Sequence, residues 1–177
     1  LESVMYSPVD IVTYYATPWK IIMTADTPGK LLENNDIVAN LNPHAEGDFT
    51  WVKPGKIMRC TKIDTEAGLR NIDFCAEHNI PYMLFDWLWY LPCTSHDGDA
   101  TKVVDKLDMK RIVDYGKEKG VGVWLYVNQH ALMKQMDELF PLLSEWGIVG
   151  VKSGFVQYAS HRWATWLHDM VRQLSLI

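Results

Sequence analysis

One arrangement repeats four times along the sequence from about residue 41: a short apolar run is followed by a stretch with helical periodicity. The apolar runs cover residues 55–60, 81–86, 121–128 and 148–152, and the helical stretches cover residues 64–78, 100–120, 131–147 and 161–174. Runs that are apolar throughout are typical of parallel strands buried on both faces. The repeat therefore predicts four consecutive βα units with right-handed crossovers.

Two architectures accommodate such units: a doubly wound sheet and part of a (β/α)8 barrel. A complete barrel needs about 250 residues, and this chain has 177. Residues 1–40 differ from the rest because they hold β-rich pieces and a turn signal at Thr27-Pro28-Gly29. We interpret residues 1–40 as the tail of a preceding β domain or a lead-in strand pair, and residues 41–177 as the α/β domain.

Composition and motifs exclude several classes of function. The net charge of −5 and the pI of about 5.6 leave no basic field for nucleic acid. No apolar run approaches the ~20 residues of a membrane span, and no basic amphipathic stretch suits a membrane surface. The sequence has no phosphate-binding loop and no nucleophile elbow, and its cysteines fall at no metal or redox spacing.

Polar and aromatic residues stand where each apolar run stops. In chain order they are Arg59 and Cys60; Asp86, Trp87, Trp89 and Tyr90; Asn128, Gln129 and His130; and Lys152, Ser153 and Gly154. Ligands of both candidate architectures bind at the carboxyl ends of the parallel strands. These positions are therefore the candidate site, and we expect the ammonium of Lys152 to pair with Asp86 because a buried charge needs a partner.

Each candidate also has a purely structural interpretation. Asp86 can cap the loop after its strand, and Gly154 can serve a tight turn. Trp89 and Tyr90 can pack under the loop that follows them. His130 can begin the next helix as its N-cap.

The residues that carry the candidate site also resemble a known family. The stretches in question read TPWKIIMTADTPGKLLENNDIVANLN, WVKPGK, DTEAGLRNIDFCAEHNIPYMLFDWLWY and GIVGVKSGFVQ. Over nearly the whole chain they resemble glycoside hydrolase family 97. The resemblance implies a bacterial α-glucosidase or α-galactosidase, exported to the periplasm or secreted and dependent on Ca²⁺, with a β-sandwich before a catalytic (β/α)8 barrel.

On this resemblance, residues 1–40 are the tail of the β-sandwich domain with its linker, and residues 41–177 are the first half of the barrel. Retaining members carry an aspartate nucleophile in a GVKVDF-like stretch, and Gly154 stands at the matching position. The resemblance therefore implies an inverting α-glucosidase. An inverting site holds a water between carboxyl groups ~6.5–9.5 Å apart, against ~5–5.5 Å for direct attack, and a glycine leaves room for that water.

The sequence thus predicts an oligosaccharide as the ligand of this chain. The predicted substrate-binding residues are Asp86, Trp89, Tyr90, Asn128, His130 and Lys152. We expect neither a catalytic carboxylate nor a Ca²⁺ ligand within the chain, because the family's acid and base motifs are absent from it.

A different class of function stays open beside this one. A sheet of four strands has open edges that invite pairing, so the chain can also be a stand-alone, non-catalytic α/β module that binds carbohydrate or associates with itself. A flavodoxin-like nucleotide-binding domain is a weaker alternative because the phosphate loop is missing.

Overall fold

The computed structural model describes residues 19–43, 47–157 and 160–175. Contacts divide the chain into two compact units, whose described parts fall within residues 19–53 and residues 54–175. We describe the two units separately. Among the described residues, no helix combines the length and the apolar character needed to cross a bilayer.

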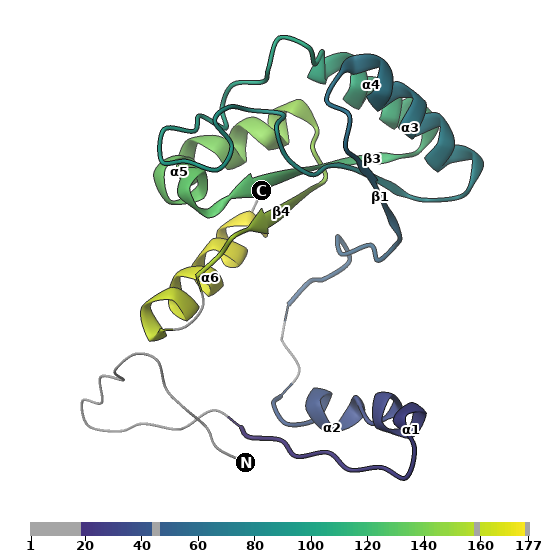
Figure 1. Cartoon of the computed structure of the whole chain (residues 1–177), viewed down its shortest axis with the longest axis vertical. Coiled ribbons are helices and arrows are strands. Elements are labelled where there is room, and N and C mark those ends of the chain that lie inside the picture. Colours follow the sequence, from purple (N-terminus) through teal and green to yellow (C-terminus); the bar gives the residue numbers. More distant parts are fainter. Residues whose placement is uncertain (1–18, 44–46, 158–159, 176–177) are drawn as a thin grey trace. The chain divides into compact units, whose positions relative to one another are not determined.

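The larger unit is a parallel sheet with a helix after each strand (Figure 1). Its strands are β1 (Ile57–Cys60), β2 (Tyr82–Phe85), β3 (Gly122–Asn128) and β4 (Gly150–Gly154), and its helices are α3 (Thr65–Glu77), α4 (Met109–Lys119), α5 (Gln129–Trp146) and α6 (His161–Leu174). The strands lie in the sheet in the order β1-β2-β3-β4. A doubly wound sheet reverses its order at a switch point, so this sequential order is that of part of a (β/α)8 barrel and confirms the predicted fold class.

Helix boundaries follow from capping side chains. The Asp64 carboxylate accepts a hydrogen bond from the backbone N–H of Ala67 and caps the start of α3. Asp108 does the same for the N–H of Arg111, so α4 begins at Met109 rather than at residue 100. The predicted helix over 100–120 is therefore too long at its start, whereas its end at Gly120, with φ 73°, is confirmed.

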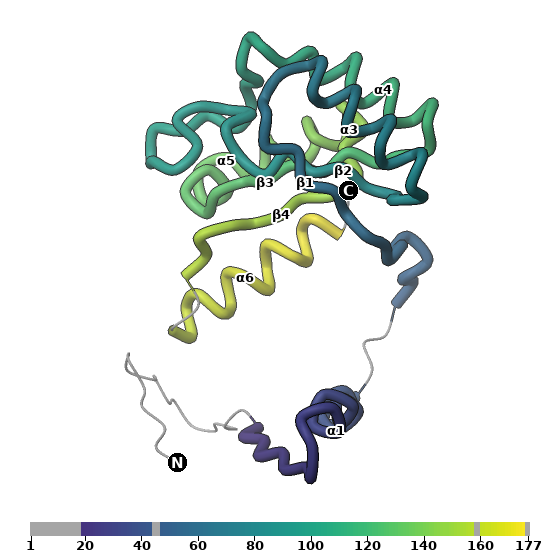
Figure 2. The backbone as a smooth tube through the Cα atoms, turned by 45° about the vertical axis from the view of Figure 1, so that its right-hand side comes forward, coloured from purple at the N-terminus to yellow at the C-terminus, as the bar shows by residue number. Residues whose placement is uncertain are grey.

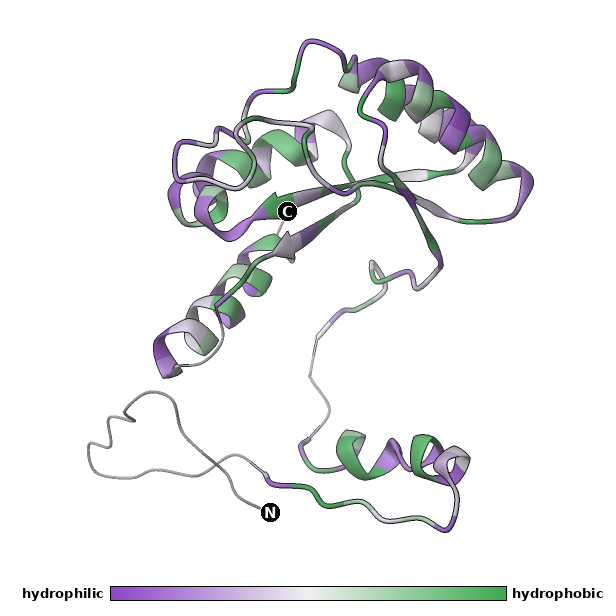
Figure 3. Cartoon of the chain, viewed as in Figure 1, coloured by the Kyte–Doolittle hydropathy of each residue, from purple (hydrophilic) through white to green (hydrophobic). Residues whose placement is uncertain are grey.

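One face of the sheet packs against α3, α4 and α5, which lie together on that side (Figure 2). Phe85 and Leu125 from the strands and Ile72 and Ile112 from the helices are fully buried there. Gly68 lets α3 approach, because a Cβ at this position would lie 3.0 Å from the Phe85 ring. Figure 3 shows the matching pattern, with hydrophobic and hydrophilic residues alternating around these helices.

The opposite face is built from aromatic rings laid over glycines. Side chains alternate between the faces along a strand, and the register Tyr126↔Lys152 places these two on this second face. A Cβ at Gly150 would overlap the Trp124 ring, and one at Gly154 would overlap the Tyr126 ring. Glycines on β4 therefore accommodate the rings of β3.

The smaller unit contains short helices where β structure was expected. Its helices are α1 (Pro28–Glu33) and α2 (Asp36–Ala39), and residues 19–40 contain no strand. Thr27 accepts a hydrogen bond from the N–H of Lys30, and Pro28 occupies the first turn, so the turn signal starts a helix instead of linking two strands. The prediction of β structure is thus wrong for residues 19–40. Residues 1–18, which the same prediction covered, lie outside the described residues. The assignment of residues 1–40 to the tail of a β-sandwich domain stays a prediction.

Candidate active site

A charge cluster joins three strands at the carboxyl edge of the sheet. Asp86, directly after β2, is only 8% exposed. Its Oδ2 lies 2.5 Å from Nε of Arg59 on β1, and its Oδ1 lies 2.5 Å from Nζ of Lys152 on β4. The predicted pair of Asp86 and Lys152 is therefore present, and Arg59 completes it as a third member.

Lys152 is less buried than its sequence context suggests. Its side chain is 49% exposed, because β4 is the last strand of the described sheet and none of its residues is fully buried. The ammonium has three N–H donors, and Asp86 occupies one of them. The remaining donors, with those of the exposed Arg59 guanidinium, are available for hydroxyl groups of a ligand.

Asn128 and His130 occupy the junction of β3 and α5. Asn128 is buried, and its side-chain oxygen accepts from the N–H of His130, so Asn128 and not His130 is the N-cap of α5. The Asn128 amide donates to the Tyr126 hydroxyl. The half-buried His130 ring lies with its centroid 3.8 Å from that of His96. Asn128 thus has a structural role here, while His130 keeps a partly accessible ring.

Trp89 and Tyr90 are fully buried, which corrects the prediction that their rings line a sugar pocket. The Trp89 indole N–H donates to the carbonyl of Tyr126, and the Tyr90 hydroxyl donates to the carbonyl of Cys93 while it accepts from the N–H of Asn128. Burial raises the pKa of Tyr90 to about 12. Both residues therefore anchor the loop after β2 and present no surface to a ligand in this structure.

The space beside Gly154 is filled by protein. The Tyr126 hydroxyl lies 2.6 Å from the point where a Cβ of residue 154 would be, and the ring is buried. Burial also raises the pKa of this phenol. The expectation that the glycine leaves room for a water is therefore wrong in this structure, because a ring from the neighbouring strand occupies the room.

The sequence analysis did not identify Arg59 as a partner of Asp86, or Tyr126 as the ring that lies beside Gly154. Arg59 stands at a strand end, but its connection to Asp86 depends on the register Arg59↔Leu84, which places it diagonally across from position 86. Tyr126 lies on the same face as Asn128 and is paired with Lys152. The period-2 alternation along β3 is the signal that identifies it.

A calcium site does not fit the described residues. No three side chains of His, Cys, Asp or Glu gather closely enough among them to hold a metal ion. Both oxygens of Asp86 face cations, which leaves that carboxylate unsuited to Ca²⁺. We therefore derive no step through calcium, and the calcium dependence implied by the resemblance stays a prediction.

Comparison with known proteins gives related enzymes with larger chains. A retaining alpha-galactosidase from Bacteroides thetaiotaomicron is 28% identical in an alignment of 152 residues that covers 78% of this chain and 22% of that protein. A probable retaining alpha-galactosidase from Streptomyces bingchenggensis is 21% identical over 88% of this chain and 26% of that protein. The chain therefore spans about a quarter of the length of the curated relatives that it matches.

Solved structures share the fold. A glycoside hydrolase family 97 enzyme from Pseudoalteromonas sp. strain K8 in complex with acarbose matches with a TM-score of 0.63 and 24% identity, over 71% of this chain and 23% of that one. A complex of a variant of such an enzyme with panose, from the same source, matches with a TM-score of 0.68 and 20% identity, over 82% of this chain and 28% of that one.

The relatives overturn the expected stereochemistry and substrate. Both are named as retaining alpha-galactosidases, so the expectation of an inverting α-glucosidase is wrong. That expectation was based on Gly154, whereas retention or inversion in glycoside hydrolysis depends on the distance between two carboxyl groups. The family itself is confirmed: the model of glycoside hydrolase 97 matches residues 51–175, and the chain belongs to this family.

Proposed function

We propose that the carboxyl edge of this sheet binds the sugar of an α-linked glycoside in a family 97 glycoside hydrolase. The observation that carries the proposal is the bridge from Asp86 to Arg59 and Lys152. The bridge fixes two cations at the edge where barrel enzymes bind substrate. Their free N–H groups suit the hydroxyls of a sugar, and the charge-assisted bonds they form are stronger than neutral ones.

Asp86 orients the cations and does not transfer protons in this proposal. Glycoside hydrolysis uses two carboxyl groups beside the scissile bond. Among the described residues at the carboxyl ends of the four strands, Asp86 supplies the carboxylate, and each of its two oxygens already faces a cation. The reaction's acid and its partner carboxylate therefore have to lie elsewhere in the complete gene product.

An α-galactoside is the first substrate to test, because both curated relatives carry that activity in their names. An α-glucoside is the comparison substrate, because family 97 enzymes have been solved with acarbose and with panose. Export to the periplasm or the medium is also part of the proposal, since oligosaccharides are met there, and fractionation of the source cells tests it.

The experiment measures hydrolysis of p-nitrophenyl α-galactoside and p-nitrophenyl α-glucoside by the complete gene product and by its Lys152→Met variant. Loss of a charge-assisted bond to the sugar should lower kcat/KM about 10- to 100-fold. Lys110→Met is the matched control, because Lys110 makes an equally short pair with Asp114 on the exposed side of α4. Absence of hydrolysis of both substrates, or equal loss in the two variants, would contradict the proposal.

A further inference from the structure

Two bulky residues adopt a left-handed backbone at the carboxyl edge of the sheet. Leu88 has φ 59° and Phe155 has φ 52°. Bulky side chains rarely adopt this conformation, and where they do, the strain is concentrated at functional sites. Phe155 directly follows Gly154 and is 77% exposed, so no burial of its ring compensates for the strain.

A second exposed aromatic residue stands at the end of β2. Trp87 directly follows Asp86, and its side chain is 41% exposed. Its loop is firmly held, because the buried Trp89 and Tyr90 are hydrogen bonded to the β3 segment and to the loop itself. The backbone N–H of Val104 also donates to the carbonyl of Trp89. Trp87 is therefore exposed on a rigid support, which is the condition for a preorganised binding residue.

The two aromatic residues follow strands that are two places apart in the sheet. Neighbouring strands lie about 4.8 Å apart, so the ends of β2 and β4 are separated by about twice that distance, which is comparable to the length of a disaccharide. The cluster of Arg59, Asp86 and Lys152 lies at the same strand ends. Exposed rings and charged donors thus share one edge of the larger unit.

This combination matches the chemistry of a sugar. A pyranose ring has an apolar C–H face that packs on an aromatic ring and an edge of hydroxyls that needs hydrogen-bond partners. We propose that Trp87 and Phe155 are sugar-stacking residues, and that each packs against the C–H face of a pyranose whose hydroxyls bind Lys152 and Arg59. The inference rests on the proposed function and adds the residues that recognise the apolar face of the substrate.

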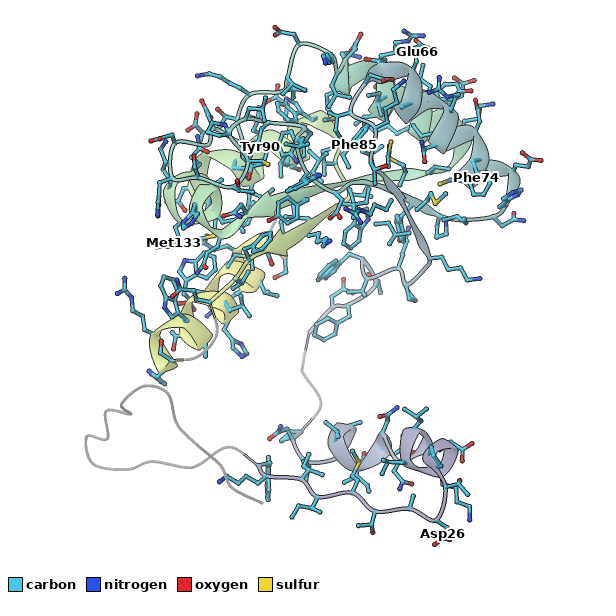
Figure 4. All side chains as sticks on the ribbon, viewed as in Figure 1. Asp26, Glu66, Phe74, Phe85, Tyr90 and Met133 are labelled. Carbon is cyan, nitrogen blue, oxygen red and sulfur yellow. The ribbon has the colours of Figure 1, made fainter. Side chains whose placement is uncertain are left out.

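The test measures binding of methyl α-galactoside and of an α-galactosyl disaccharide to the complete gene product by calorimetric titration and saturation-transfer NMR. The Trp87→Ala and Phe155→Gly variants should each weaken disaccharide binding about tenfold. In the saturation-transfer spectra, magnetisation saturated on the protein should reach mainly the C–H protons on one face of the sugar. Phe74→Ala is the matched control, because Phe74 is a half-exposed aromatic residue on α3 (Figure 4) and should leave binding unchanged.

Phe155→Gly separates a binding role from a structural one. Glycine accepts a positive φ without strain, so the melting temperature should stay equal or rise while binding weakens. Equal binding by Trp87→Ala, Phe155→Gly and Phe74→Ala, in a protein whose binding still depends on Lys152, would overturn this inference alone. Absence of sugar binding by the unmodified protein would overturn it together with the proposed function.

Discussion

The two faces of the sheet are built in different ways. The face that packs on α3, α4 and α5 is apolar and closed, with Phe85, Leu125 and Val127 fully buried. On the other face rings lie over glycines, and the indole nitrogen of Trp124 is buried without a hydrogen-bond partner among the described residues. The comparison indicates that the helix-covered face holds the fold together, whereas the strand ends of the second face carry the charge cluster that we propose as the sugar site.

The largest effect is expected on the helix-covered face. Leu125→Ala removes a fully buried side chain from the centre of the core, and it should lower the free energy of unfolding by about 2–5 kcal/mol. Urea denaturation measures this change. Leu91→Ala, at an exposed position in the loop after β2, is the matched control and should cost about 0.5 kcal/mol or less. Similar costs for the two variants would show that this face is not the stabilising core.

A smaller effect is expected from the ring-over-glycine packing. Gly154→Ala places a methyl group where the Tyr126 ring lies, and overpacking of this kind costs about 1–3 kcal/mol. Chemical denaturation again gives the value. Adding Tyr126→Ala should recover part of the loss caused by Gly154→Ala, because the overlapping ring is then gone. Two costs that simply add would mean that the ring and the glycine are not a packed pair.

The smallest effect on stability is expected from the charge cluster. Lys152→Met should lower the free energy of unfolding by only about 1 kcal/mol or less, because the ammonium is half exposed and Asp86 keeps its pair with Arg59. The expected difference from Lys110→Met is therefore small in unfolding experiments and large in kcat/KM. A loss of several kcal/mol would assign the cluster to the fold instead of to the ligand.

Most of the βα architecture could be predicted because periodicity and capping are local. Helix α6 begins and ends at the residues that its apolar pattern predicts, and Asp64 caps α3 through a hydrogen bond to a residue only three positions away. The environment of Trp89 and Tyr90 stayed open at the level of the sequence, because packing under the following loop and lining a sugar pocket both suited their position. Their burial depends on bonds to the main chain at Cys93 and Tyr126, which only the folded loop brings within reach.

The candidate site was predictable to a similar extent. Polar residues at the strand ends indicated the edge, and the distant pair of Asp86 and Lys152 follows from the parallel topology. The filling of the space beside Gly154 could not be foreseen, because it depends on the rotamer of Tyr126 on the next strand. The stereochemistry of hydrolysis could not be predicted for a related reason, because it depends on the distance between two carboxyl groups in the folded enzyme.

A crystal structure of the complete gene product with a slowly hydrolysed α-galactoside analogue tests the central claim most directly. We expect sugar hydroxyls within hydrogen-bond distance of Lys152 or Arg59, with Asp86 still bridging the two cations, and a pyranose face against Trp87 or Phe155. A sugar bound in the active site without contact to any of these residues would contradict the account.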